Sequence, residues 1–123
     1  QALNADVKVL ADVLVKHAVP LGPVDLGLIA RETAQRGLAD GLIVSGAATG
    51  EETAVSDVSV VRRTIPDGLV LVGSGVNEKN IWQVIEHSDG AIIGTSLKED
   101  GIITNRVDPE RVRRMSEIFR SLP

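Results

Sequence analysis

The chain has 123 residues, of which 43% are apolar and 24% charged, a composition typical of a single globular domain. Its net charge of −4 disfavours a general nucleic-acid partner, which usually meets a basic surface. The chain contains no cysteine, which excludes disulfides and thiolate metal sites and fits a reducing, cytoplasmic compartment. No apolar run approaches the roughly 20 residues that a membrane-spanning helix needs.

The first predicted element is a strand within Val7–Lys16. If this segment is extended, Asp12 and Lys16 lie on one face and Val13 lies on the other, apolar face, which should meet the helices. The two charged residues would point into the interior of a barrel. They are either a structural pair or an acid–base or Schiff-base constellation, and the adjacent His17 is either a hydrogen-bonded rim residue or a catalytic imidazole.

Three Asp-Gly pairs each precede a short apolar run rich in β-branched residues, which predicts strands within Asp40–Gly46, Asp67–Gly73 and Asp89–Thr95. Helical patterns separate and follow these strands. They run from a cap at Asp25 to about Arg36, from about Glu52 to Thr64, from just after Asn77, and from a cap at Asp108 to the end of the chain. This alternation of strands and helices predicts an α/β fold with a parallel sheet.

The last helix has the clearest start signal, with Asp108 at the N-cap and Pro109 in the first position. Its predicted buried stripe consists of Val112, Met115, Phe119 and Leu122. Its basic cluster, formed by Arg111, Arg113, Arg114 and Arg120, is interpreted as a solvated helix face.

Four strand–helix units fit either a small open sheet or half of a (β/α)8 barrel, which normally needs about 250 residues. The glycine pattern described below favours the half-barrel, and we predict one domain over residues 1–123. Because the chain begins at Gln1 in mid-pattern, we expect a fragment or a processed chain. A half-barrel exposes two unpaired sheet edges, so we expect a homo-oligomer or pairing with a missing N-terminal half.

Two glycine-rich loops follow neighbouring predicted strands, where a phosphate is commonly bound in barrels. Glycines let the backbone approach an anion, and hydroxyl groups add donors. Alternatively, the glycines only permit tight turns. The predicted phosphate-binding residues are Gly73, Ser74, Gly75, Gly94, Thr95 and Ser96.

Three further residues are candidate substrate contacts. Ser45 and Thr49 follow the second predicted strand, where helix capping and turn formation are the alternative roles. Lys98 either neutralises the phosphate or belongs to a solvated loop. We expect no metal and no cofactor, because no acidic or histidine cluster has ligand spacing and Gly73-Ser74-Gly75 lacks the third glycine of a dinucleotide fingerprint.

These motifs together resemble the BtpA family over nearly the whole chain. The matching segments are Val15–Ala18, Asp40–Gly50, Gly73–Val76 with Asn80, Asp89–Lys98 with Asp100-Gly101, and Val107-Asp108 with Arg111-Val112. The family is named for a cyanobacterial photosystem I biogenesis protein, and other members are described as sugar-operon enzymes or nucleosidases. The resemblance implies strands 5 to 8 of a ribulose-phosphate-binding barrel, and it implies no catalytic residue because the family has no established reaction.

Two functions follow as expectations. One is a phosphate-ester site for a phosphorylated sugar or a nucleotide-like ligand, with lyase, hydrolase or isomerase chemistry left open and Asp12, Lys16 and His17 as catalytic candidates. The other is a non-enzymatic assembly factor, which predicts an exposed apolar patch on the helical face.

Overall fold

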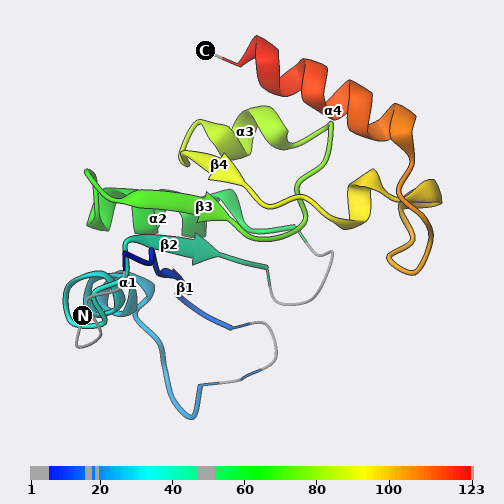
Figure 1. The fold of residues 1–123 in the computed structure, drawn as a ribbon. Helices are drawn as coiled ribbons and strands as arrows, with labels where there is room; N and C mark the ends of the chain where they lie inside the picture. Colours follow the sequence, from blue (N-terminus) through cyan, green and yellow to red (C-terminus); the bar gives the residue numbers. More distant parts are fainter. Residues whose placement is uncertain (1–5, 16–17, 19, 47–51, 123) are drawn as a thin grey trace.

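Four parallel strands form one sheet in the order β1-β2-β3-β4 (Figure 1) in a computed structural model, in which residues 6–15, 18, 20–46 and 52–122 are described. The strands are β1 (Leu10–Asp12), β2 (Gly41–Val44), β3 (Leu69–Val72) and β4 (Gly90–Ala91). The helices are α1 (Leu26–Gln35), α2 (Val55–Thr64), α3 (Ile81–Ile85) and α4 (Pro109–Ser121), with short 3-10 helices η1 (Thr95–Leu97) and η2 (Glu99–Gly101). The predicted α/β alternation is confirmed.

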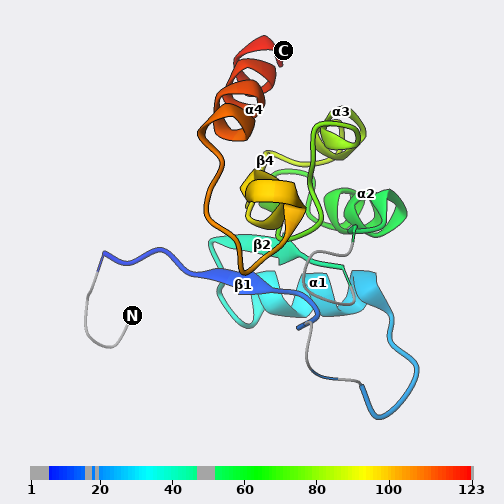
Figure 2. The ribbon, with the colours of Figure 1, turned by 90° about the vertical axis from the view of Figure 1, so that its right-hand side faces the viewer.

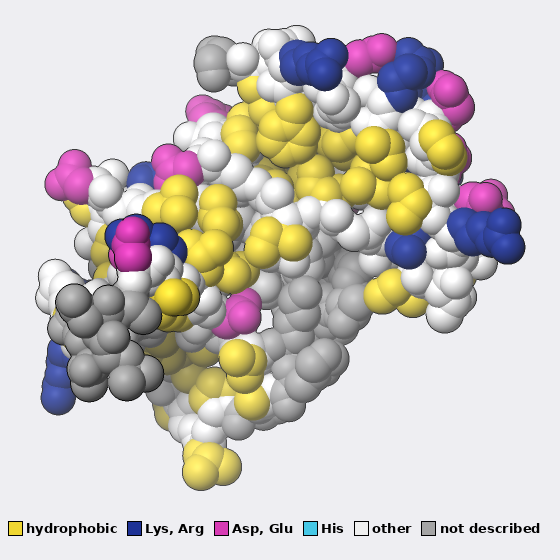
Figure 3. Space-filling view, in the orientation of Figure 1, with side chains coloured by type: hydrophobic (Ala, Val, Ile, Leu, Met, Phe, Trp, Pro, Cys, Tyr) yellow, Lys and Arg dark blue, Asp and Glu magenta, His cyan; other side chains and the backbone are white. Residues whose placement is uncertain are grey.

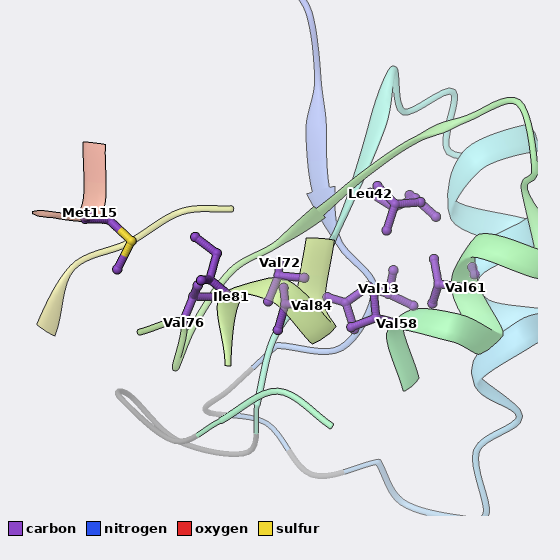
Figure 4. Close-up of a cluster of buried hydrophobic side chains, with 12 residues drawn as sticks. Val13, Leu42, Val58, Val61, Val72, Val76, Ile81, Val84 and Met115 are labelled. Atoms are coloured by element: carbon purple, nitrogen blue, oxygen red, sulfur yellow. The ribbon is translucent and has the colours of Figure 1, made fainter. Parts of the chain in front are cut away.

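The core lies between one face of the sheet and the helices. Alternate strand residues Leu42, Val44, Val70 and Val72 point to this face and are at most 3% exposed. Helix α2 contributes Val58 and Val61, which are completely buried. Figure 2 shows α1, α2 and α3 in succession along one side of the sheet, and Figure 4 shows side chains of α2 and α3 beside those of the strands. Burial of this aliphatic layer is the main contribution to stability.

Both predicted aspartate N-caps are present. The Asp25 carboxylate accepts a hydrogen bond from the Leu28 amide at 3.0 Å, and that of Asp108 accepts one from the Glu110 amide at 2.9 Å. Helix α4 departs from prediction at Val112, which is 38% exposed instead of lying in a buried stripe. Met115, one turn further along the same face, is inserted into the core where the helix packs against η1, whereas the described residues cover Val112 only in part.

The second face of the sheet is apolar but uncovered. Gly41, Leu10 and Leu69 meet on this face across three strands, and the two leucines are 45% and 39% exposed. Asp12 is exposed, whereas Val13 is 5% exposed in the core, which confirms the predicted separation of these two side chains. The predicted strand continues no further than Asp12, and Val15 is 55% exposed.

Two of the repeated Asp-Gly pairs join neighbouring strands at their amino ends. The Asp40 carboxylate accepts a hydrogen bond from the Val9 amide at 2.8 Å, and that of Asp89 accepts one from the Val70 amide at 2.7 Å. Asp89 also pairs with Arg62 of α2. Partial burial raises the pKa of Asp89, but the Val70 and Arg62 hydrogen bonds more than offset this effect and hold that pKa below 3.8.

Replacing Asp89 with asparagine is expected to lower the free energy of unfolding by about 1–2 kcal/mol at pH 7. Asp89 is 43% exposed, so solvent screening keeps the loss within this modest range. A depressed folded-state pKa stabilises the fold above pH 3.8, and this contribution disappears as the pH falls through the folded-state value. Urea unfolding at pH 7 and pH 3 should therefore show the difference between the two proteins shrinking in acid.

The matched control is Asp67→Asn, which makes the same substitution in another of the repeated Asp-Gly pairs. Asp67 is exposed, and its carboxylate accepts no hydrogen bond from any described residue. An equal loss of stability in both variants would show that the strand-joining hydrogen bonds of Asp89 contribute nothing specific.

Candidate functional site

A cavity of about 550 Å³ lies beside the loops that follow β3 and β4. These loops lie at the carboxyl ends of adjacent parallel strands, where ligands bind in α/β proteins. The start of α4 closes the cavity from the side. Its lining residues are Glu52, Gly75, Val76, Asn77, Glu78, Lys79, Gly94, Thr95, Ser96, Gly101, Arg111 and Arg114.

The loop after β3 is held in shape by its asparagines. Gly75 has a φ of 72°, a left-handed conformation that favours glycine. Its carbonyl oxygen accepts hydrogen bonds from the side-chain amides of Asn77 at 3.2 Å and Asn80 at 2.9 Å. The Asn80 side chain also accepts one from the Asn77 amide, at 2.9 Å. This loop therefore presents a fixed backbone to the cavity.

The loop after β4 is tied to the first loop through Ser96. Its hydroxyl donates to the Val76 carbonyl at 2.7 Å, so this side chain joins the two cavity walls. The backbone N–H groups of Gly75, Gly94 and Thr95 donate no hydrogen bond to any other described residue. Unpaired N–H groups on the wall of a polar cavity favour an anionic ligand.

Gly73 and Ser74 do not line the cavity. The Gly73 amide donates to the Val44 carbonyl at 2.7 Å within the sheet, and an added Cβ would lie 2.4 Å from the Ser45 hydroxyl oxygen. Ser74 is 6% exposed, and its hydroxyl accepts a hydrogen bond from the Gly46 amide at 2.9 Å. Thr53 donates to the Ser74 carbonyl at 3.0 Å. These contacts give both residues a structural role, and whether either also contacts a phosphate stays a prediction.

Asp12 and Ser45 meet at the carboxyl ends of β1 and β2. The Ser45 hydroxyl donates to the Asp12 carboxylate at 3.3 Å. Neither residue lines the cavity. Three further candidates, Lys16, His17 and Thr49, lie outside the described residues.

The positive charge at the cavity comes from residues that the sequence analysis did not assign to the site. Lys98 does not line the cavity, whereas Lys79, Arg111 and Arg114 do. The predicted solvated position of Arg111 is wrong, because its side chain is 31% exposed and lines the cavity. Its position in the first turn after the Asp108 cap was the available signal, because that turn begins at the same edge of the sheet as the two loops.

The cavity has polar groups of two kinds. Three basic side chains and the unpaired amides suit an anion such as a phosphate. Two other lining residues form a pair, in which the Asn77 side chain donates to the Glu52 carboxylate at 3.1 Å. The carboxylate can accept hydrogen bonds from ligand hydroxyl groups, and the amide side chain can donate to them. The arrangement therefore suits a molecule that carries an anionic group and hydroxyls.

Within the described ranges, no group of three histidine, aspartate or glutamate side chains is placed to hold a metal ion. In the same part of the chain, no helix is long and apolar enough to cross a membrane.

Comparison with known proteins gives matches along nearly the whole chain. A family model described as the BtpA family matches residues 1–121. The photosystem I biogenesis protein BtpA of Synechocystis is 43% identical over 125 residues, covering 98% of this chain and 44% of that protein. Uncharacterised proteins from Pyrococcus furiosus and Thermococcus kodakarensis are 42% and 39% identical, each match covering 98% of this chain and 45% of the relative. The chain thus spans less than half the length of these relatives.

Proposed function

The chain belongs to the BtpA family, and we propose that its four strand–helix units are strands 5 to 8 of a ribulose-phosphate-binding (β/α)8 barrel. The exposed apolar face of the sheet supports this proposal, because Leu10, Leu69 and Ile92 are 39–49% exposed there or beside it. In a closed barrel this face is filled by side chains from the other strands. Closure would also remove the two free sheet edges, by pairing with an N-terminal half or with a second copy.

We propose that the site binds the phosphate of a phosphorylated sugar or a nucleotide-like ligand. The observation that carries this proposal is the cavity itself, which Gly75, Gly94, Thr95 and Arg111 line together. These residues come from two loops and a helix that are separated in sequence but adjacent at the sheet edge. Ser96 joins the same loops through its hydroxyl, and Lys98, which does not line the cavity, stays a candidate substrate contact.

Asp12 and Ser45 form a second polar group at the same edge of the sheet. If the barrel is closed, a ligand held by its phosphate at β3 and β4 would extend over the barrel centre toward β1 and β2. Asp12 is therefore our candidate for acid–base chemistry of the lyase, hydrolase or isomerase class, together with Lys16 and His17.

The alternative is a non-enzymatic assembly role, which the printed name of the Synechocystis relative assigns to that protein. One observation favours it: apolar side chains gather at the surface between α3 and α4 (Figure 3). Trp82 of α3 is 49% exposed and Val112 of α4 is 38% exposed. Such a patch is suited to a protein partner.

The deciding experiment is a calorimetric titration of the complete protein with ribose 5-phosphate, ribulose 5-phosphate and adenosine 5′-monophosphate. We expect saturable binding of at least one phosphate ester and much weaker binding of the corresponding dephosphorylated compound. If no phosphate ester binds, the phosphate-site proposal is wrong, and the apolar surface between α3 and α4 becomes the feature to investigate.

A further inference from the structure

Arg111 is the most firmly positioned cation of the cavity. Its Nε lies 3.5 Å from the Asp108 carboxylate, and one terminal nitrogen donates to the Ser96 carbonyl at 3.2 Å. The side chain is 31% exposed, so about two thirds of it is covered. The second terminal nitrogen makes no hydrogen bond to another described residue. The guanidinium is thus held on two sides and retains donors for a ligand.

Arg114 lies one helical turn further along and also lines the cavity. Its Nε is 3.1 Å from the carboxylate of Glu78, which belongs to the loop after β3 and lines the same cavity. Both side chains are partly exposed, at 45% and 40%. The ion pair therefore connects α4 to the loop. Within it, Arg114 neutralises the Glu78 carboxylate, which would otherwise repel an anionic ligand.

The neighbouring Arg113 shows that this placement is specific. It makes ion pairs with Glu110 at 2.9 Å and Glu117 at 2.7 Å along the outside of α4. Its side chain is 58% exposed and does not line the cavity. Three arginines within four positions of one helix thus divide into two that face the cavity and one that faces away.

Resting on the phosphate site proposed above, we infer that Arg111 binds the phosphate directly and that Glu78 restrains Arg114 as a second, partly neutralised cation. A phosphate monoester carries about −1.5 to −2 charges at pH 7, whereas a diester carries only one. Lys79, Arg111 and Arg114 all line the cavity, so a dianionic phosphate would meet three basic groups, and the planar fork of arginine suits two phosphate oxygens. The site therefore selects dianionic monoesters over monoanionic diesters.

Arg111→Gln and Glu78→Gln are expected to have opposite effects on ribose 5-phosphate binding in the complete protein. Arg111→Gln removes a charge-assisted contact and weakens binding by about 10- to 100-fold. Glu78→Gln removes a negative charge from the cavity and releases Arg114, so binding tightens by roughly two- to tenfold. Arg113→Gln, on the same helix, leaves the affinity within about twofold. Circular dichroism and thermal unfolding establish that each variant is folded.

Selectivity supplies a readout that a purely structural role would not change. The wild type is expected to bind methyl phosphate more tightly than dimethyl phosphate, and Arg111→Gln should reduce this ratio. Arg111→Lys, which retains the charge, keeps part of the ratio and serves where the glutamine variant does not fold.

The outcomes separate this inference from the function it rests on. Phosphate binding that is unchanged in Arg111→Gln and Arg111→Lys, or weakened in Glu78→Gln, would overturn the inference and leave the phosphate site standing. A wild type that binds no phosphate ester would remove both.

Discussion

Replacing Gly94 with aspartate should weaken ribose 5-phosphate binding by about 100-fold, because two like charges about 5 Å apart repel by about 3 kcal/mol at an effective dielectric constant near 20. Gly94 lines the cavity, and a Cβ built at this position meets no atom within 4 Å. The aspartate therefore fits without displacing its neighbours, and its carboxylate adds negative charge where the phosphate is proposed to lie. Calorimetric titration of the variant and the wild type measures the effect.

Gly22→Asp is the matched control, since it makes the same change in composition and net charge. Gly22 is exposed, its added Cβ also meets nothing within 4 Å, and it does not line the cavity. We expect its affinity for the phosphate ester to equal that of the wild type. Equal affinities in Gly94→Asp and the wild type would place the phosphate elsewhere; equal losses in both variants would reduce the effect to overall charge.

Replacing Gly73 with alanine should lower the free energy of unfolding by about 1–3 kcal/mol, the usual cost of overpacking a tightly packed position. The new Cβ would lie 2.4 Å from the Ser45 hydroxyl oxygen and 2.5 Å from Cγ2 of Ile43. The branched Ile43 side chain is attached to β2, so relief requires a shift between two strands. Equilibrium unfolding in urea measures the change.

Gly94→Ala is the control for this prediction, because its Cβ enters open space. It should change stability by less than about 0.5 kcal/mol. The pair also distinguishes the roles of the two glycines, since Gly73 is a packing residue in the sheet and Gly94 is a cavity residue. If Gly73→Ala retained wild-type stability but lost phosphate binding, Gly73 would belong to the ligand site after all.

The candidate site was predictable from sequence only in part. Gly75, Gly94, Thr95 and Ser96 were predicted because a glycine loop after a strand is visible in the sequence, and all four line the cavity. Whether they bind phosphate stays a prediction. The buried position of Ser74 was not visible, because its partners Gly46 and Thr53 come from a different loop.

The charged residues were the least predictable. Lys98 is predicted as a substrate contact because it follows the glycine loop directly, but the basic residues that line the cavity are Lys79, Arg111 and Arg114. Whether Lys98 contacts a substrate stays a prediction. Proximity in sequence is a poor guide here, since the chain continues through η2 and a further loop before α4 returns to the same edge. Helical periodicity predicts a buried Val112 and a solvated Arg111, and the structure shows neither. The exposure of each side chain depends on which elements flank α4.

The sequence by itself determined the order of the strands and helices, the aspartate caps of α1 and α4, and the aliphatic strands, because short-range capping and side-chain periodicity set these features. The tertiary structure alone decided that the two glycine loops share one cavity with the first turn of α4, and which arginines enter it. The physical reason is that parallel pairing brings the ends of β3 and β4 together across a long connection. The charges at the site then depend on how α4 packs against η1, which no local pattern specifies.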